Sequence, residues 1–461
     1  MAILEKMSKR NKGIALAVLL TAIIIYFSFY AFFRSHFYFG TEINGVNVSC
    51  KTTEQADKEL AAFTTAYSLE LSERNNVKEQ ITGSEIGLKA NTEGGSEALK
   101  TEQNKSFWFT SLFDHKATKL GTGFTVDEKL LQAAYSKLSC VDSSKMTEPK
   151  NATIIYGANG YEVVNEVYGN KANYDILYPA IKNAAVNGTT KLDLEGIKCY
   201  IGPTLTADSD KVKNTKKMLD KYITAHITYN YDGGSEVVDA AEIADWAELD
   251  KDLNIVLNQT EIKNFVNKLA SYYNTVGKSR TFQTSTGSVI QVGGGDYGWK
   301  VNVNGEAAYL VEAIKNGVSE DRTPTYSQKG EVQGQNDLGN TYVEINISAQ
   351  HLWYYKNGAL FVEGDVVTGN VSKGNGTPGG IYMLKYKERN ATLKGQGYSS
   401  PVAYWMPFNN NIGIHDAPWR TEFGKDIYLT AGSHGCVNSP PALAQTIYEN
   451  ISAGVPVICY Y

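Results

Sequence analysis

A cysteine and two histidines lie close together near the C-terminal end of the sequence. Cys436 belongs to the segment Ser-His-Gly-Cys-Val-Asn at 433–438, and His415 precedes that segment by a spacer of 17 residues. The whole chain has only six histidines and five cysteines. A thiol is a strong nucleophile only as thiolate, and a nearby histidine is the usual base that deprotonates it near neutral pH. The stretch therefore predicts a cysteine nucleophile with a histidine base.

The residues after Cys436 predict the element that positions it. Ser439 is typical of a helix N-cap, Pro440 of the first helical position, and Gly454 of the helix end. Cys436 would then lie just before a helix N-terminus, where the helix dipole favours the thiolate. The backbone N–H groups of Gly435 and Cys436 could stabilise a developing oxyanion.

Two other interpretations of these residues stay open. An isolated cysteine is more often a small buried apolar side chain than a nucleophile. His415, His434 and Cys436 could also supply three zinc ligands. The sequence has no Cys-x-x-Cys or His-Glu-x-x-His pattern to support a zinc site.

The pattern of His415, the 17-residue spacer and the segment 433–438 resembles the signature of L,D-transpeptidase catalytic domains. These domains are cysteine enzymes that cross-link peptidoglycan. The resemblance covers residues 341–461 and includes the segment 350–355, the Gly-Thr-Pro-Gly-Gly turn at 376–380 and His-Asp-Ala-Pro-Trp at 415–419. Several separated matches in the right order make it specific.

The resemblance implies a role for each residue of the signature. Cys436 would be the nucleophile and His415 the general base. Ser433, His434 and Gly435 would shape the cleft and the oxyanion hole.

Residues around the signature could support the catalytic residues or line a peptide groove. Asp416 can orient His415 only if the chain bends there, because neighbours in a strand point to opposite faces. A backbone carbonyl is an equally good partner for His415. Asn438 would support the loop. The residues that could line a peptide groove, although such positions are more often core, are Trp405, Met406 and Trp419.

The reaction that the resemblance implies is acyl transfer in two steps. Cys436 attacks the carbonyl after the third residue of a stem tetrapeptide, and D-Ala leaves. The side-chain amine of an acceptor stem then attacks the thioester and gives a 3→3 cross-link, a step of cell wall biogenesis. Carbapenems are the expected inhibitors, and no metal or organic cofactor is needed. The alternatives are an L,D-carboxypeptidase, in which water attacks the same acyl-enzyme, and a non-catalytic scaffold that binds the cell wall.

Length and composition indicate the number of domains and the class of partner. The 461 residues suggest two to four domains, and 42% hydrophobic residues are enough for cores. The net charge is −5, so nothing suggests nucleic-acid binding. Tyrosine is abundant, at 30, which suits carbohydrate or peptide surfaces but is common in β domains too. The five cysteines are scattered and odd in number, which leaves the pairing of Cys140 and Cys199 open.

The N-terminus predicts the compartment. Residues 13–33 carry no charge and are numerous enough to span a bilayer. Lys6, Lys9, Arg10 and Lys12 precede them, which places the N-terminus in the cytoplasm. A signal peptide is the alternative, but the run is longer than a usual signal core and lacks a clear cleavage site. We expect a single-pass signal anchor in the cell membrane, with the later domains outside, in the cell wall.

An internal repeat lies between this anchor and the signature. The helical pattern at 125–138 returns at 259–273 with an offset of 131 (269 − 138), and 180–183 returns at 313–316 with an offset of 133. A helix passing into a strand at 56–71 returns at 216–231 with an offset near 159, which implies an insertion of about 25 residues in the first copy, placed at 91–123. The opening at 41–56 resembles repeats assigned to peptidoglycan binding, and a plain spacer is the alternative.

These patterns together predict the architecture. The two repeats read as α+β, and residues 341–461 as a mostly β, sandwich-like domain with one main helix. Asn357-Gly358 predicts a two-residue hairpin, and further strands are predicted at 366–368, 381–385, 412–415, 427–430 and 455–460. We expect, in order, a cytoplasmic tail at 1–12, the anchor at 13–33, repeats at 41–203 and 205–325, a linker at 326–340 and the catalytic domain at 341–461.

Overall fold

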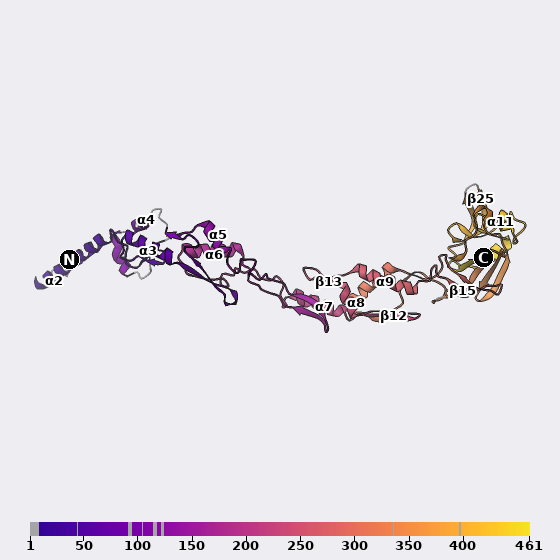
Figure 1. Cartoon of the computed structure of the whole chain (residues 1–461), viewed down its shortest axis with the longest axis horizontal. Helices are drawn as coiled ribbons and strands as arrows, with labels where there is room; N and C mark the ends of the chain where they lie inside the picture. The colour runs from indigo at the N-terminus through magenta and orange to yellow at the C-terminus, as the bar shows by residue number, and fades with distance from the viewer. Residues whose placement is uncertain are drawn as a thin grey trace. The chain divides into compact units, whose positions relative to one another are not determined.

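The computed structural model describes residues 9–461 except 44, 91–94, 104, 114–117, 121–123, 335 and 396–397 (Figure 1). The chain divides into two compact units. The first is Met1–Ile155 with Val163–Lys213, and the second is Tyr156–Glu162 with Asn214–Tyr461.

The N-terminal helix α2 spans Lys9–Phe32 and has a mean hydropathy of 2.3 over its most apolar window. None of its residues is buried. Its length and composition are sufficient to cross a membrane. The predicted apolar span at 13–33 thus forms one continuous helix up to Phe32, while membrane insertion itself stays a prediction.

The first repeat is built on a small three-stranded sheet. Strands β3 (Ser68–Ser72) and β4 (Lys78–Thr82) form an antiparallel pair, and β10 (Lys191–Asp193) lies parallel to β3. Three helices with side-chain N-caps pack around one core: α3 (Thr53–Ala66), α5 (Glu128–Tyr135) and α6 (Tyr174–Val186). The other elements are β1 (Thr41–Ile43), β2 (Val46–Asn47), η1 (Arg74–Asn76), β5 (Lys89–Ala90), α4 (Gly95–Glu102), η2 (Lys105–Leu112), β6 (Thr118–Leu120), β7 (Phe124–Thr125), β8 (Thr153–Gly157) and β9 (Gly160–Val164). The predicted insertion at 91–123 lies partly outside the described residues.

The second repeat has the same sheet topology. Strand β11 (His226–Tyr231) pairs antiparallel with β12 (Gly234–Val238) and parallel with β18 (Ser319–Asp321). Helix α9 (Gln259–Tyr273) begins at the N-cap Asn258, which is 131 residues after Asp127, the N-cap of α5. The predicted offset therefore aligns two helix starts, and the boundaries of the repeats stay predictions. The other elements are α7 (Asp210–Tyr222), α8 (Ala240–Trp246), β13 (Ala247–Leu249), β14 (Ile255–Leu257), β17 (Lys300–Val301), α10 (Val303–Asn316) and β19 (Tyr326–Gln328).

The C-terminal part is rich in strands and contains two sheets. The five-stranded sheet has the order β22-β21-β20-β28-β23, and the four-stranded sheet has the order β24-β25-β26-β27. Val343 of the first sheet, Met406 of the second and Leu443 of helix α12 (Pro441–Asn450) belong to one core. The predicted mostly β, sandwich-like domain with one main helix is confirmed. Its strands are β20 (Tyr342–Asn346), β21 (His351–Lys356), β22 (Ala359–Asp365), β23 (Gly380–Met383), β24 (Glu388–Gly395), β25 (Tyr398–Asn409), β26 (Ile412–Asp416), β27 (Val437–Ser439) and β28 (Pro456–Tyr460), with a short helix η3 at Val371–Lys373.

A hairpin from upstream of this domain packs against its five-stranded sheet. Strands β15 (Arg280–Gln283) and β16 (Val289–Val292) contribute Phe282 and Val292 to a core shared with Ile381 of β23 and Ile458 of β28. The predicted linker at 326–340 also takes part, because its Leu338 belongs to this core and its Asp337 is fully buried. The domain boundaries remain predictions.

Three local predictions differ from the structure. Residues predicted as a strand at 427–430 form the short helix α11 (Ile427–Ala431). The predicted strand at 366–368 holds only an isolated bridge between Val367 and Asn438. The N-cap of α12 is Pro440, not Ser439, which lies in β27 instead.

Candidate active site

Strand β26 holds His415 in a buried position. Its exposed fraction is 3%, and the register of β26 with β25 places it directly opposite Trp405. Its Nδ1 lies 2.8 Å from the backbone oxygen of Asp416. Because a carbonyl can only accept, Nδ1 carries the proton and Nε2 keeps its lone pair in the neutral ring. The imidazole is therefore held in the tautomer that a general base needs.

The side chain of Asp416 does not supply this contact. Its carboxylate accepts hydrogen bonds from the backbone N–H groups of Ala403 (3.1 Å) and Tyr404 (2.8 Å) in β25. The side chain is thus tied to the neighbouring strand, and the backbone carbonyl orients His415, as the alternation of side chains along a strand requires.

A tight turn holds Cys436. Ser433 Oγ donates to the backbone oxygen of Cys436 at 2.5 Å and accepts from the N–H of Gly435 at 3.0 Å. Thr377 Oγ1 donates to the carbonyl of Gly435 at 2.6 Å. The N–H of Gly435 therefore donates within the turn, and its part in an oxyanion hole stays a prediction. The N–H of Cys436 makes no hydrogen bond within the part of the chain that the structure describes, so it stays available for that role.

Gly435 is required by the shape of this turn. Its φ is +121°, where L side chains are strained, and an added Cβ would lie 3.0 Å from Ile412 Cδ1. The neighbouring segment approaches it closely, because a Cβ on Gly369 would lie 2.9 Å from the Gly435 Cα. Glycines on both sides thus allow the nucleophile turn to pack against the segment that carries Thr377.

Burial shifts the pKa values of both candidate catalytic groups. It raises the pKa of Cys436 to about 11, although a hydrogen bond with the backbone of Gly413 lowers it. The thiol donates to the carbonyl of Asn411 at 3.5 Å. Burial also lowers the pKa of His415 below its ordinary value. The resting pair is therefore a neutral thiol and a neutral imidazole near pH 7.

The predicted effect of a helix dipole on Cys436 is wrong. Strand β27 (Val437–Ser439) separates Cys436 from the first residue of α12, Pro441. The dipole effect fades within one helical turn, so it does not offset burial here.

Cys436 and His415 line one cavity of about 180 Å³. Ser433, His434 and Asn438 line it as well. The structure thus brings together the predicted nucleophile, base and signature residues. The His434 side chain is exposed, and among the described residues no cluster of three or more His, Cys, Asp or Glu side chains could hold a metal ion.

The three predicted groove residues take different places. Trp419 lines the cavity and is 50% exposed. Trp405 is buried in a small apolar cluster against which Cys436 packs. Met406 lies in the domain core and not in the cavity, because it alternates with Trp405 along β25 and so faces Ile414 instead of His415.

Two polar groups of the cavity lack partners. Arg420 Nη2 donates to the carbonyl of Ala431 at 2.8 Å, while the buried Nε has no hydrogen-bond partner among the described residues. The same holds for the buried Oδ1 of Asn438, in β27 beside His415. Burial lowers the pKa of Arg420. Sequence reasoning missed Arg420, because no spacing rule links it to the signature.

Comparisons with known proteins identify two families along the chain. Residues 340–459 match the family model of the L,D-transpeptidase catalytic domain, and residues 206–322 match that of a peptidoglycan-binding domain. A cysteine-to-serine variant of the Enterococcus faecium L,D-transpeptidase is 30% identical over 53% of this chain and 98% of its own, with a TM-score of 0.43. The catalytic domain of the E. faecium enzyme acylated by ertapenem is 41% identical over 26% of this chain and 98% of its own, with a TM-score of 0.25. No curated protein matches the chain.

Proposed function

The chain belongs to the L,D-transpeptidase family, and we propose that it forms 3→3 cross-links in peptidoglycan through a thioester on Cys436. One observation carries this proposal. Cys436 and His415 line the same cavity, and the Asp416 carbonyl holds the imidazole with Nε2 as proton acceptor. A neutral thiol beside a neutral base is suited to proton transfer during attack.

The first step forms the thioester. His415 Nε2 takes the proton of the Cys436 thiol as the sulfur bonds to the carbonyl carbon after the third stem residue. The N–H of Cys436 stabilises the oxyanion, and such a donor contributes about 3–4 kcal/mol in related chemistry. When the C–N bond breaks, His415 returns the proton to the leaving amine and D-Ala departs.

The second step consumes the thioester. His415 takes a proton from the side-chain amine of an acceptor stem as that amine attacks the thioester carbonyl. The C–S bond breaks, and the sulfur leaves as the thiol with the proton from His415. The new amide is the 3→3 cross-link, and no metal or organic cofactor takes part.

We assign the two unpartnered groups of the cavity to substrate positioning. Arg420 Nε is a buried donor and suits a carboxylate of the donor stem. Asn438 Oδ1 is a buried acceptor and suits a backbone N–H of that stem. Each would gain its missing partner when the substrate binds.

The other segments of the chain would position the catalytic cavity at the cell wall. We propose that α2 anchors the protein in the cell membrane and that the later domains lie outside, in contact with peptidoglycan. The apolar length of α2 and the family model at 206–322 support this placement.

A product assay tests the proposal. The full chain in detergent is incubated with a disaccharide-tetrapeptide, and the products are identified by mass spectrometry. We expect a dimer with the mass of two monomers minus one D-Ala, absent with Cys436→Ala. Tripeptide monomer alone would indicate the carboxypeptidase, and unchanged substrate would favour the scaffold.

A further inference from the structure

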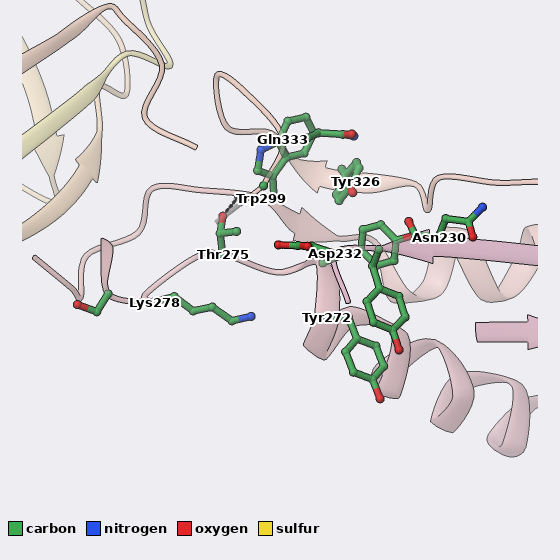
Figure 2. Close-up of a pocket in the computed structure, with 12 residues that line it drawn as sticks. Asn230, Asp232, Tyr272, Thr275, Lys278, Trp299, Tyr326 and Gln333 are labelled. Carbon is green, nitrogen blue, oxygen red and sulfur yellow. Dashed lines mark hydrogen bonds between the residues drawn. The ribbon is translucent and has the colours of Figure 1, made fainter. Parts of the chain in front are cut away.

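A second recess lies on the second repeat, formed by residues outside the catalytic cavity. Its volume is about 540 Å³, within the usual range for small-molecule sites. Its walls come from elements far apart in the sequence, with Asn230 from β11, Tyr272 from α9 and Tyr326 from β19 (Figure 2). We call this recess the tyrosine cleft.

Five aromatic rings form a continuous row along this cleft. Tyr272 and Tyr231 stack in parallel, with ring centroids 4.2 Å apart and an interplanar angle of 4°. Tyr231 meets Tyr273 edge-on at 6.1 Å, and Tyr273 meets Tyr326 at 6.4 Å. Trp299 closes the row 4.6 Å from Tyr326. One parallel contact and three edge-on contacts hold these rings in place as a stiff wall.

Part of the row is exposed, whereas the rings of a hydrophobic core would be buried. Tyr272 is 41% exposed, Tyr231 is half-buried, and Trp299 at the other end is buried. Exposed, contiguous aromatic surface of this kind usually marks a binding site. The row is therefore exposed to solvent at the Tyr272 end, where the stacked pair keeps its outer faces for a ligand, and is anchored at the Trp299 end.

Polar side chains at the rim lack partners. Asn230, Asp232 and Gln333 line the cleft, and their side chains make no hydrogen bond within the described part of the chain. Amide groups on two of them offer both donors and acceptors. Aromatic rings with a few convergent polar groups are the usual composition of a ligand site, and this cleft combines five rings with polar side chains.

Internal bonds hold the cleft open in advance. The Tyr273 hydroxyl donates to the backbone oxygen of Asn230 at 2.5 Å, and Trp299 Nε1 donates to that of Val332 at 2.6 Å. At the base, the Trp299 N–H donates to Thr275 Oγ1 at 2.8 Å (Figure 2). A preformed wall loses little conformational entropy when a ligand binds.

We propose that the tyrosine cleft binds the glycan strand of peptidoglycan, with sugar rings lying on Tyr231 and Tyr272. The choice of polymer rests on the proposed function and on the family model that matches 206–322. Sugar rings offer apolar faces to aromatic rings and hydroxyl or acetamido edges to the neutral amides of Asn230 and Gln333. A charged stem peptide would find one acidic and one basic side chain here, Asp232 and Lys278.

The described residues of the first repeat form no such row at the equivalent positions, despite the equal sheet topology. Strand β3 ends at Ser72, where β11 ends at Tyr231. With the offset of 131, the residues equivalent to Tyr272 and Tyr273 are Val141 and Asp142. The cleft is therefore a property of these side chains and not of the fold.

Binding without turnover tests the assignment. The full chain in detergent carries Cys436→Ala, and its affinity for peptide-free glycan strands is measured by calorimetry. We expect Tyr272→Ala to weaken the affinity about tenfold, which equals ~1.4 kcal/mol. Asn230→Ala, on the rim, should weaken it too, without removing any ring. The control is Tyr168→Ala, an exposed tyrosine (53%) of the first repeat, and it should bind as before.

Each outcome decides the question. Unchanged affinity in both cleft variants, with thermal melting unaltered, would overturn the assignment. So would binding of free stem tetrapeptide with no binding of glycan. Because no turnover is measured, failure here leaves the transpeptidase proposal untouched, and failure of the cross-linking assay leaves this result untouched.

Discussion

The catalytic cavity and the tyrosine cleft are two recesses of the same unit with opposite construction. The cavity holds about 180 Å³ and the cleft about 540 Å³. In the cavity, burial shifts the pKa values of Cys436 and His415 and leaves single polar atoms without partners. In the cleft, a row of rings that runs from exposed Tyr272 to buried Trp299 forms the wall, and polar side chains gather at the rim.

The two recesses are therefore suited to different tasks, the cavity to catalysis and the cleft to glycan binding. A reacting group gains from burial, because the low dielectric strengthens a few directed interactions. A surface that holds a long polymer gains from exposed, stiff area instead. Variants in one recess should therefore affect turnover, and variants in the other should affect binding.

The sharpest test of this separation is Cys436→Ala. Removal of the nucleophile should lower turnover by on the order of a million-fold, as in serine enzymes that lose theirs. Glycan affinity should stay unchanged, because Cys436 does not line the tyrosine cleft. Cross-linking rates and calorimetry on one preparation give both values. A parallel loss of glycan binding would show that the two recesses act as one functional site.

His415→Ala should have the next largest effect, a loss of about 10²–10⁴-fold in acylation rate. The wild-type pH profile gives a finer result. The base works only when neutral, and burial lowers its pKa below 6.5. The rate should therefore stay high as pH falls to 6.5 and decline only below it. An acid limb with a midpoint above 6.5 would contradict the buried, uncharged imidazole.

The two recesses also differ in the contacts that stabilise them. Backbone bridges support the cavity, while Thr275 at the base of the cleft donates to Asp337, which forms a fully buried ion pair with Arg280. Asp337→Ala leaves the Arg280 charge buried and unpaired, which should lower the free energy of unfolding by about 3–5 kcal/mol. The matched control is Glu312→Ala, which removes an exposed pair and should cost about 0.5 kcal/mol. Thermal or denaturant melting separates the two.

Arg420→Met should raise the KM for the donor stem by about 10–100-fold, because the variant lacks a charged donor for the substrate carboxylate. Arg389→Met is the matched control, since Arg389 is half-exposed on β24 and outside the cavity. Steady-state kinetics with a soluble tetrapeptide give the values. Equal effects of the two variants would remove Arg420 from substrate binding.

The smallest effect concerns the resting thiol. Burial raises the pKa of Cys436 to about 11, so the rate of alkylation by iodoacetamide should keep rising up to that pH. The alkylated peptide is followed by mass spectrometry, which separates Cys436 from the other cysteines. A plateau near pH 7 would show a preformed thiolate and would remove the need for His415 as base during attack.

The sequence predicted those parts of the fold that local chemistry determines. Asn357 and Gly358 adopt φ values of 52° and 84°, as their hairpin turn requires. A short apolar run such as 427–430 fits a strand or a helix equally well, and here it forms α11. The long pair of β24 and β25 was not predicted as a hairpin, because the polar sequence of β24 gives little alternation.

The candidate site was predictable in its residues but not in its hydrogen bonds. Spacing placed Cys436 and His415 together, and the comparisons identify the same family. The occupied N–H of Gly435 and the backbone contact of His415 depend on how Ser433 and Asp416 fold back, which spacing does not encode. The tyrosine cleft could not be predicted from spacing either, since its tyrosines come from β11, α9 and β19 and Trp299 from the residue before β17.

The most direct test of the central claim is the intact mass of the full chain after brief incubation with a disaccharide-tetrapeptide. We expect an adduct equal to the substrate minus D-Ala, located on the peptide that contains Cys436 and absent in Cys436→Ala. Cross-link formation with no adduct at Cys436, or with an adduct at another residue, would contradict the account.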